Sequence, residues 1–204
     1  MSHIGCDIVS LKHFSPRGLY ERDSYLRKAY TSAEISQIEE NPDIAAVFWA
    51  TKESAYKLHS KTGGEGAFSP GLFECHIIEN QNTEHTNCFE LHVTRGARTY
   101  CARAEAMQEA VICRATEKSE PEACVQHVIK RLAEHEDASI SAREILALVL
   151  NPELSFEEIP SIIDHPEEDY PRINPDINSP FEDFSISHDH ELLLITLLRK
   201  EAHV

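Results

Sequence analysis

Phe48-Trp49-Ala50-Thr51-Lys52-Glu53-Ser54-Ala55-Tyr56-Lys57 is the stretch that decides how this chain folds. It lies inside the longest helix that we expect, from residue 43 to about residue 59, and the glycines at 63, 64 and 66 end that helix. Trp49, Glu53 and Lys57 recur at every fourth position and share one helix face. Glu53 and Lys57 alone could be a surface ion pair worth only a few tenths of a kcal/mol. The neighbouring tryptophan instead indicates a partly buried carboxylate that needs a counter-charge.

A second informative stretch, Gly5-Cys6-Asp7-Ile8-Val9, predicts a short buried strand that carries an aspartate. Asp7 could simply cap a turn at the strand end. Paired with Glu53, it could form a hard-cation site, because Mg²⁺ prefers one or two carboxylates together with water and phosphate oxygens. Lys57, one helical turn after Glu53, could steady a phosphate oxygen or relay a proton from an attacking hydroxyl.

A third stretch near the other end, Phe184-Ser185-Ile186-Ser187-His188-Asp189, predicts another strand. Ser187 and His188 are adjacent on it and should point to opposite faces, which argues against a catalytic Ser–His pair. His188-Asp189-His190 could belong to a zinc site, but no further ligand pattern accompanies it. A histidine that contacts an anionic ligand is the better functional interpretation.

The remaining elements of the first part follow from local signals. Thr31-Ser32-Ala33-Glu34 is a capping box that predicts a short helix running toward Asn41. Four segments between residues 72 and 115 alternate or run apolar between turn residues, and they predict an antiparallel meander. The polar break at 117–121 is a candidate boundary, so we expect one module over residues 1–117 and a second over residues 118–204.

The second part combines helical signals with a final hairpin. Val125, Val128, Ile129 and Leu132 are spaced as one helix face, and Ser141-Ala142-Arg143-Glu144 resembles another capping box, heading a helix over 145–150. An acidic, proline-rich segment from 152 to 180 should be extended. Residues 184–187 and 191–198 predict a terminal hairpin. The expected fold is therefore α+β, with antiparallel sheets packed against a long helix, and the order of elements hints at two similar modules.

Charge and hydropathy exclude some classes of function. The net charge is −16, with 12 Lys and Arg against 16 Asp and Glu in residues 1–117, and 7 against 19 in residues 118–204. General nucleic-acid binding needs a basic footprint and is not expected. No apolar run approaches the roughly 20 residues of a membrane span, and the N-terminal residues do not resemble a signal peptide. We therefore expect no membrane contact and a cytoplasmic location.

Taken together, the three stretches resemble the motifs of the 4′-phosphopantetheinyl transferases, in order and in residue identity. That family carries a Gly-x-Asp-Ile strand, a helix of the form Trp-x-x-Lys-Glu-x-x-x-Lys and a Ser-x-Ser-His strand. These appear here as residues 5–9, 49–57 and 185–188. Residues 30–34 also resemble the family's Phe-Thr-x-x-Glu helix start, and Tyr170-Pro171-Arg172-Ile173 resembles the stretch before its last hairpin.

The resemblance implies a function and a set of site residues. The enzyme would transfer 4′-phosphopantetheine from coenzyme A to a serine of an acyl or peptidyl carrier protein, releasing adenosine 3′,5′-bisphosphate. The site would lie between the two modules. Asp7 and Glu53 would ligate Mg²⁺, and Glu53 and Lys57 would be catalytic. The groups expected to bind coenzyme A are Ser187, His188 and two basic residues of the first part, Lys61 and Arg17.

The chain also departs from the family pattern. Val9 stands where the larger members often have a third acidic ligand, so a water would fill that place. The motif order, with Ser-His last, matches the short, trimeric holo-acyl-carrier-protein synthases, yet this chain is much longer, and we favour a monomer over a trimer. Two other classes stay open: a non-catalytic protein that binds coenzyme A or a carrier, and an unrelated Mg²⁺-dependent phosphohydrolase.

Overall fold

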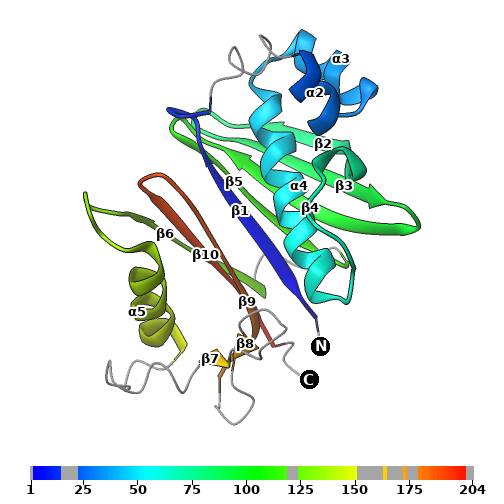
Figure 1. Ribbon diagram of the computed structural model, residues 1–204. Helices are drawn as coiled ribbons and strands as arrows, with labels where there is room; N and C mark the ends of the chain where they lie inside the picture. Colours follow the sequence, from blue (N-terminus) through cyan, green and yellow to red (C-terminus); the bar gives the residue numbers. More distant parts are fainter. Residues whose placement is uncertain are drawn as a thin grey trace.

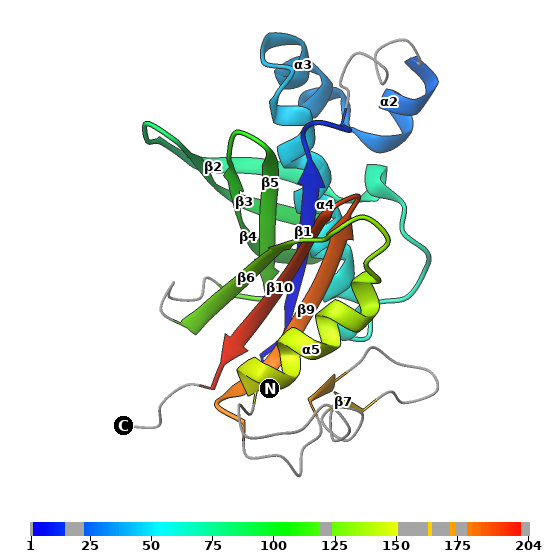
Figure 2. The ribbon, with the colours of Figure 1, turned by 90° about the vertical axis from the view of Figure 1, so that its left-hand side faces the viewer.

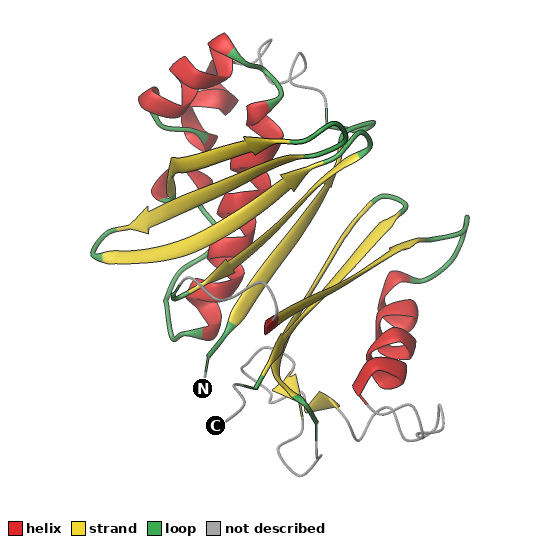
Figure 3. Ribbon diagram, turned by 180° about the vertical axis from the view of Figure 1, so that it is seen from behind, coloured by secondary structure: helices red, strands yellow, loops and turns green. Residues whose placement is uncertain are grey.

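A computed structural model describes residues 2–14, 23–118, 124–150, 163–164, 172–173 and 179–200 of the chain. Two antiparallel sheets lie side by side, and the outer face of each is covered by a helix (Figures 1 and 3). The expected α+β class with antiparallel sheets is therefore confirmed. No helix of the described residues is long and apolar enough to cross a membrane.

The first sheet has the strand order β1-β5-β4-β3-β2. Its strands are β1 (Ile4–Ser10), β2 (Glu74–Asn82), β3 (Asn87–Arg95), β4 (Arg98–Ala106) and β5 (Ala110–Thr116). Strands β2 to β5 are neighbours in chain order, which confirms the predicted meander, and β1 then pairs antiparallel with β5. This arrangement makes β1 an edge strand of the sheet.

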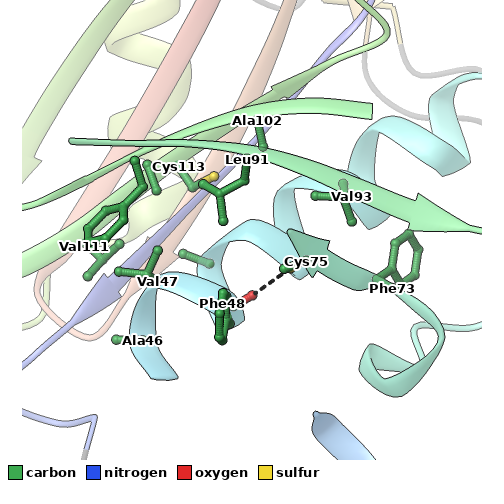
Figure 4. Close-up of a cluster of buried hydrophobic side chains, with 14 of the residues drawn as sticks. Ala46, Val47, Phe48, Phe73, Cys75, Leu91, Val93, Ala102, Val111 and Cys113 are labelled. Carbon is green, nitrogen blue, oxygen red and sulfur yellow. Dashed lines mark hydrogen bonds between the residues drawn. The ribbon is translucent and has the colours of Figure 1, made fainter. Parts of the chain in front are cut away.

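The long helix α4 (Ile44–Lys61) lies across one face of this sheet (Figure 1). Apolar side chains of the helix and the sheet form the main core, in which Phe48 is fully buried and Cys75 packs against its backbone (Figure 4). Gly5 allows α4 to lie directly on β1, because a β-carbon at this position would be 2.1 Å from the carbonyl oxygen of Ser54. The glycine of the first motif thus sets the distance between the two elements that carry Asp7 and Glu53.

Two short helices, α2 (Asp23–Ala29) and α3 (Ser32–Glu40), precede α4. The predicted capping box is present: the Glu34 backbone N–H donates to Thr31 Oγ1, and the Thr31 backbone N–H donates to Glu34 Oε2. Glu34 is also fully buried and forms an ion pair with the fully buried Lys52 of α4 at 2.8 Å. One glutamate therefore both starts α3 and fixes it to α4.

The second sheet has the strand order β6-β10-β9. Its strands are β6 (Val125–Arg131), β9 (Phe181–Asp189) and β10 (Leu192–Arg199), and α5 (Ala138–Leu150) packs on its outer face. The predicted terminal hairpin is confirmed as β9 and β10. A two-stranded sheet joins β7 (Ile163–Asp164) to β8 (Arg172–Ile173), and most of the segment expected to be extended, 152–180, lies outside the described residues.

The helix expected around residues 125–132 is wrong, because residues 125–131 form strand β6. The helical spacing of Val125, Val128, Ile129 and Leu132 misled the prediction. Three of those four side chains are β-branched and favour a strand. The open edge of β10 supplies the hydrogen-bonding partner, with Ile195 opposite Val128.

The second predicted capping box is also wrong, because α5 already begins at Ala138 and Ser141 lies inside it. The first-turn N–H groups of Ser139 and Ile140 donate instead to Oδ1 of Asp137, at 2.8 and 3.0 Å. Ser141 donates its hydroxyl to Glu136 at 2.6 Å. The helix is therefore capped four residues earlier than the sequence pattern suggested.

Strand β9 of the second sheet lies beside β1, the edge strand of the first (Figure 2). Side chains of β9, rather than a backbone ladder, join the two strands. The backbone N–H of Ile4 donates to Asp183 Oδ2 at 2.8 Å, and that of Cys6 donates to Ser185 Oγ at 2.9 Å. Further along, the N–H of Ser10 donates to Asp189 Oδ2 at 2.7 Å. We call this alternating row of β9 side chains the β1–β9 seam. The division into modules at residue 117 falls between the two sheets and stays a prediction.

Candidate active site

A pocket of about 610 Å³ lies where β1, α4 and β9 meet. Five of the residues singled out from the sequence line it together, although they come from distant parts of the chain: Asp7, Glu53, Lys57, Ser187 and His188. The other lining residues are Ile8, Val9, His13, Phe14, Trp49, Ile186, Asp189 and His190. Lys61 does not line the pocket, and Arg17 lies outside the described residues.

Asp7 projects from β1 into the pocket but is only 6% exposed. Its Oδ1 accepts two hydrogen bonds, from Ser187 Oγ at 2.6 Å and from Lys57 Nζ at 3.0 Å. Burial raises the pKa of Asp7, while Lys57 and the hydroxyl of Ser187 counteract part of that rise. The carboxylate is therefore held in place from both sides, by α4 and by β9.

Glu53 projects from α4, one helical turn before Lys57. Burial and the nearby negative charge of Asp7 raise the pKa of Glu53 to about 7, against the opposing effect of Lys57. Within the described part of the chain, no hydrogen bond to its carboxylate is seen. Glu53 is thus a partly buried acid beside a second acid, and it lacks a close partner among the described residues.

The two carboxylates provide a test of whether a metal ion fits here. No group of three His, Cys, Asp or Glu that could hold a metal occurs among the described residues, so a closed protein cage is absent from them. Mg²⁺ does not need one, because it is commonly held by one or two carboxylates and completes its shell with water and phosphate oxygens. The mutual repulsion of Asp7 and Glu53 is the property that such a cation would relieve. The donors therefore fit Mg²⁺ bound together with a phosphate-containing ligand.

Lys57 donates to the carbonyl oxygen of Cys6 at 2.9 Å as well as to Asp7. Although burial disfavours the charged amine, the negative charges around Lys57, that of Asp7 foremost, raise its pKa. The side chain is therefore an ammonium at neutral pH. Two of its three hydrogens are used in these contacts, and the third can donate to a ligand.

Ser187 and His188 lie side by side on β9 and point to different sides, as expected for neighbours on a strand. Ser187 is 6% exposed and its hydroxyl reaches Asp7. His188 is exposed and lines the pocket. This places His188 where it can meet an anionic ligand, whereas the hydrogen of the Ser187 hydroxyl is already donated within the protein.

Lys61 is an anchor between elements in this structure. Its Nζ donates to both carboxylate oxygens of Asp183, at 3.0 and 3.1 Å, and to the carbonyl oxygens of Ile4 and Phe184. The side chain is only 9% exposed. It connects α4, β1 and β9 and is not directed at the pocket.

Two pocket histidines, His13 and His190, are not among the residues predicted to bind coenzyme A or Mg²⁺. His13 follows β1, and His190 occupies the turn between β9 and β10 with a φ of 51°. Their rings stack with centroids 3.7 Å apart, and His13 Nε2 lies 3.3 Å from Glu191. His190 was noted only as a possible zinc ligand. No sequence signal joins two histidines so far apart, and their meeting depends on β9 lying beside β1.

Comparison with known families decides the relationship. The family model described as the 4′-phosphopantetheinyl transferase superfamily matches residues 3–115. The chain belongs to this superfamily. Comparisons with curated proteins and with solved structures gave no significant match.

The region of this phosphopantetheinyl transferase superfamily member that matches the family model corresponds to a defined part of the structure. Residues 3–115 span the first sheet and helices α2 to α4, including Asp7, Glu53 and Lys57. The pocket residues of β9 and the following turn, Ile186 to His190, lie beyond the match. One side of the pocket therefore comes from the matched region and the other side from the second sheet.

Proposed function

We propose that this chain transfers the 4′-phosphopantetheine group of coenzyme A to a serine of an acyl or peptidyl carrier protein, with Mg²⁺ bound by Asp7 and Glu53. The observation that carries the proposal is the meeting of two carboxylates, an ammonium and the Ser-His strand in one pocket. Membership of the superfamily supports the class of reaction and implies coenzyme A and a carrier protein as partners.

The reaction exchanges one phosphorus–oxygen bond for another. The carrier serine oxygen attacks the coenzyme A phosphorus that bears the pantetheine group, and the bond from this phosphorus to the bridging oxygen breaks. That oxygen keeps the electron pair and leaves as part of adenosine 3′,5′-bisphosphate. Mg²⁺ bound at the two carboxylates would neutralise charge on the diphosphate.

The side chains of the pocket fit distinct roles in this exchange. Glu53 lies in the pocket beside Asp7 and Lys57, and it would both hold the cation and accept the proton of the serine hydroxyl. Lys57 is held as an ammonium by Cys6 and Asp7 and can donate its remaining hydrogen to a phosphate oxygen. His188 can donate to a further phosphate oxygen at the exposed side of the pocket.

The test mixes the purified protein with coenzyme A, Mg²⁺ and an apo-carrier protein, and follows the carrier by intact-mass spectrometry. We expect a gain of one phosphopantetheine that a chelator abolishes. Asp7→Asn and Glu53→Gln should each lower the transfer rate by at least about a hundredfold, because each removes a negative ligand from the metal site. Glu84→Gln, which changes an exposed carboxylate on the β2–β3 loop, is the matched control and should leave the rate unchanged.

Other outcomes point to the other classes. Cleavage of coenzyme A without any carrier would indicate a phosphohydrolase. Bound coenzyme A with no transfer to several carriers would indicate a binding protein. Full transfer rates in both carboxylate variants would contradict the proposed roles of Asp7 and Glu53.

A further inference from the structure

One side chain of the β1–β9 seam, that of Ser187, makes a different kind of contact from the others. Asp183, Ser185 and Asp189 each accept a backbone N–H of β1. Ser187 lies between the last two in the same alternating row. Its hydroxyl donates to the Asp7 carboxylate at 2.6 Å, which is the shortest of these four contacts.

The hydrogen bond between Ser187 and Asp7 is buried and is supported by a second donor. Ser187 and Asp7 are each 6% exposed, so little solvent competes for the bond. Lys57 donates to the same oxygen, Oδ1, from the opposite element. Both described donors thus engage Oδ1, and among the described residues none donates to Oδ2, which leaves that oxygen for a ligand in the pocket.

We propose that Ser187 is a positioning residue: its hydroxyl holds Oδ1 of Asp7 so that Oδ2 faces the site of the metal and the diphosphate. This deepens the proposed function and rests on it. It also reassigns Ser187, which the sequence led us to expect as a coenzyme A ligand, to a role that acts through Asp7. The terminal hairpin would then contribute to cation binding without supplying a metal ligand.

The physical basis is the orientation of a ligand by its second partner. A carboxylate that ligates a metal is commonly fixed by a hydrogen bond to its other oxygen, and loss of such a partner typically lowers metal affinity or activity about 10-fold to 100-fold. Without Ser187 Oγ, only Lys57 would hold Asp7, and the carboxylate could rotate about its terminal bond. The effect should therefore appear in cation binding rather than in the binding of coenzyme A.

Ser185 offers a matched control within the same row. It is 4% exposed, lies two residues from Ser187, and accepts the N–H of Cys6 without lining the pocket. Ser185→Ala and Ser187→Ala each remove one seam hydroxyl of equal size. A merely structural role for Ser187 would give the two variants the same behaviour.

The experiment measures Mn²⁺ binding to the full chain in the presence of coenzyme A by electron paramagnetic resonance, and the Mg²⁺ dependence of transfer. Ser187→Ala should weaken Mn²⁺ binding and raise the half-saturating Mg²⁺ concentration by roughly 10-fold to 100-fold. The KM for coenzyme A at saturating Mg²⁺ should stay within about twofold. Ser187→Thr, which keeps the hydroxyl, should recover most of the cation affinity, and Ser185→Ala should keep wild-type affinity.

Several results would overturn the inference. One is an unchanged cation affinity in Ser187→Ala, and another is an equal loss in Ser185→Ala. A raised KM for coenzyme A with normal Mg²⁺ dependence would make Ser187 a ligand of coenzyme A. Thermal unfolding of each variant shows whether a loss of Mn²⁺ binding is caused by misfolding. If Ser187→Ala is misfolded, Ser187→Thr provides the test. A Ser187→Thr variant that folds normally but binds Mn²⁺ weakly would contradict the proposal.

The inference and the proposed function can fail separately. Suppose that the wild-type chain does not transfer phosphopantetheine, but that it binds Mn²⁺ more tightly than Ser187→Ala does. The proposed function is then wrong, and the positioning role of Ser187 is supported. If the wild-type chain transfers phosphopantetheine and Ser187→Ala binds Mn²⁺ with wild-type affinity, the proposed function is supported and the positioning role of Ser187 is wrong. If the wild-type chain neither transfers nor binds Mn²⁺, both are wrong.

Discussion

At the scale of single residues, the pocket shows how one side chain determines the chemistry of its neighbour. Glu53 is partly buried and close to Asp7, and both effects raise its pKa to about 7. The same proximity that suits the pair to a cation makes the ionised glutamate unfavourable when no cation is bound. Function and stability therefore conflict at this position.

Glu53→Gln should make the metal-free protein more stable at pH 8. A carboxyl whose pKa is raised on folding binds its proton more tightly in the folded state, so the folded state loses stability as the pH rises from about 4.5 to about 7. Glutamine removes that loss. After a discount for the partial exposure of Glu53, we expect a gain of about 1–2 kcal/mol at pH 8 and no difference near pH 4.

Urea unfolding of both proteins in chelator, at pH 4 and pH 8, measures this difference. Addition of Mg²⁺ and coenzyme A at pH 8 should reverse the order, because a ligand that binds only the intact site stabilises the wild-type protein more. A variant less stable than the wild type at pH 8 without metal would show that the charge of Glu53 is already compensated.

At the scale of elements, the second sheet is attached to β1 through charged and hydroxyl side chains rather than through a shared strand ladder. Lys61 of α4 is central to this attachment, because it binds Asp183 of β9 together with carbonyl oxygens of β1 and β9. Asp183 is 5% exposed. Burial acts to raise the pKa of Asp183, but the nearby His3, the charge of Lys61 and the backbone N–H of Ile4 outweigh it and lower the pKa, so that Asp183 is held as a carboxylate.

Lys61→Met should destabilise the protein by about 3 kcal/mol at pH 7, since it leaves a buried carboxylate without its cation. The deficit should shrink as the pH falls toward 4, because Asp183 then takes up a proton and no longer needs a counter-charge. Below the melting transition, the KM for coenzyme A should stay within about twofold of the wild-type value.

Chemical unfolding and transfer kinetics of Lys61→Met test both parts of this expectation. Lys118→Met, at an exposed position after β5, is the control and should change stability by less than about 0.5 kcal/mol. A large rise in KM for coenzyme A without a loss of stability would restore Lys61 as a ligand of coenzyme A.

At the scale of the whole molecule, one chain supplies both sides of the pocket. β1 and α4 provide Asp7, Glu53 and Lys57, and β9 with its following turn provides Ser187, His188 and His190. A small cluster of apolar side chains, including Ile8, Ile112 and Leu194, fills the space between the two sheets. A second copy is therefore not needed to complete the described pocket.

We expect the active species to be a monomer of 23.1 kDa. Sedimentation should give this mass at micromolar concentration. The transfer rate per molecule should not change between nanomolar and micromolar protein, because no subunit has to associate before the pocket is complete. A rate per molecule that rises with protein concentration, together with a trimer mass, would contradict this expectation.

Local patterns in the sequence determined much of this protein. Four predicted features involve groups that are close in the chain: the Thr31–Glu34 capping box, the long helix, the meander and the hairpin. The spacing of residues along the sequence is enough to predict such local geometry. The sharing of one face by Trp49, Glu53 and Lys57 follows in the same way from the helical repeat. These residues could therefore be placed in one site before any tertiary contact was known.

The tertiary structure alone decided which partners the remaining groups found. Residues 125–131 became a strand because β10 offered an open edge, which overrode a helical apolar spacing. Lys61 became an anchor because Asp183 and two carbonyl groups surround it. Ser187 reached Asp7, 180 residues away in sequence, because β9 lies beside β1. Such contacts depend on how elements pack across the chain, and no periodicity within a single element encodes them.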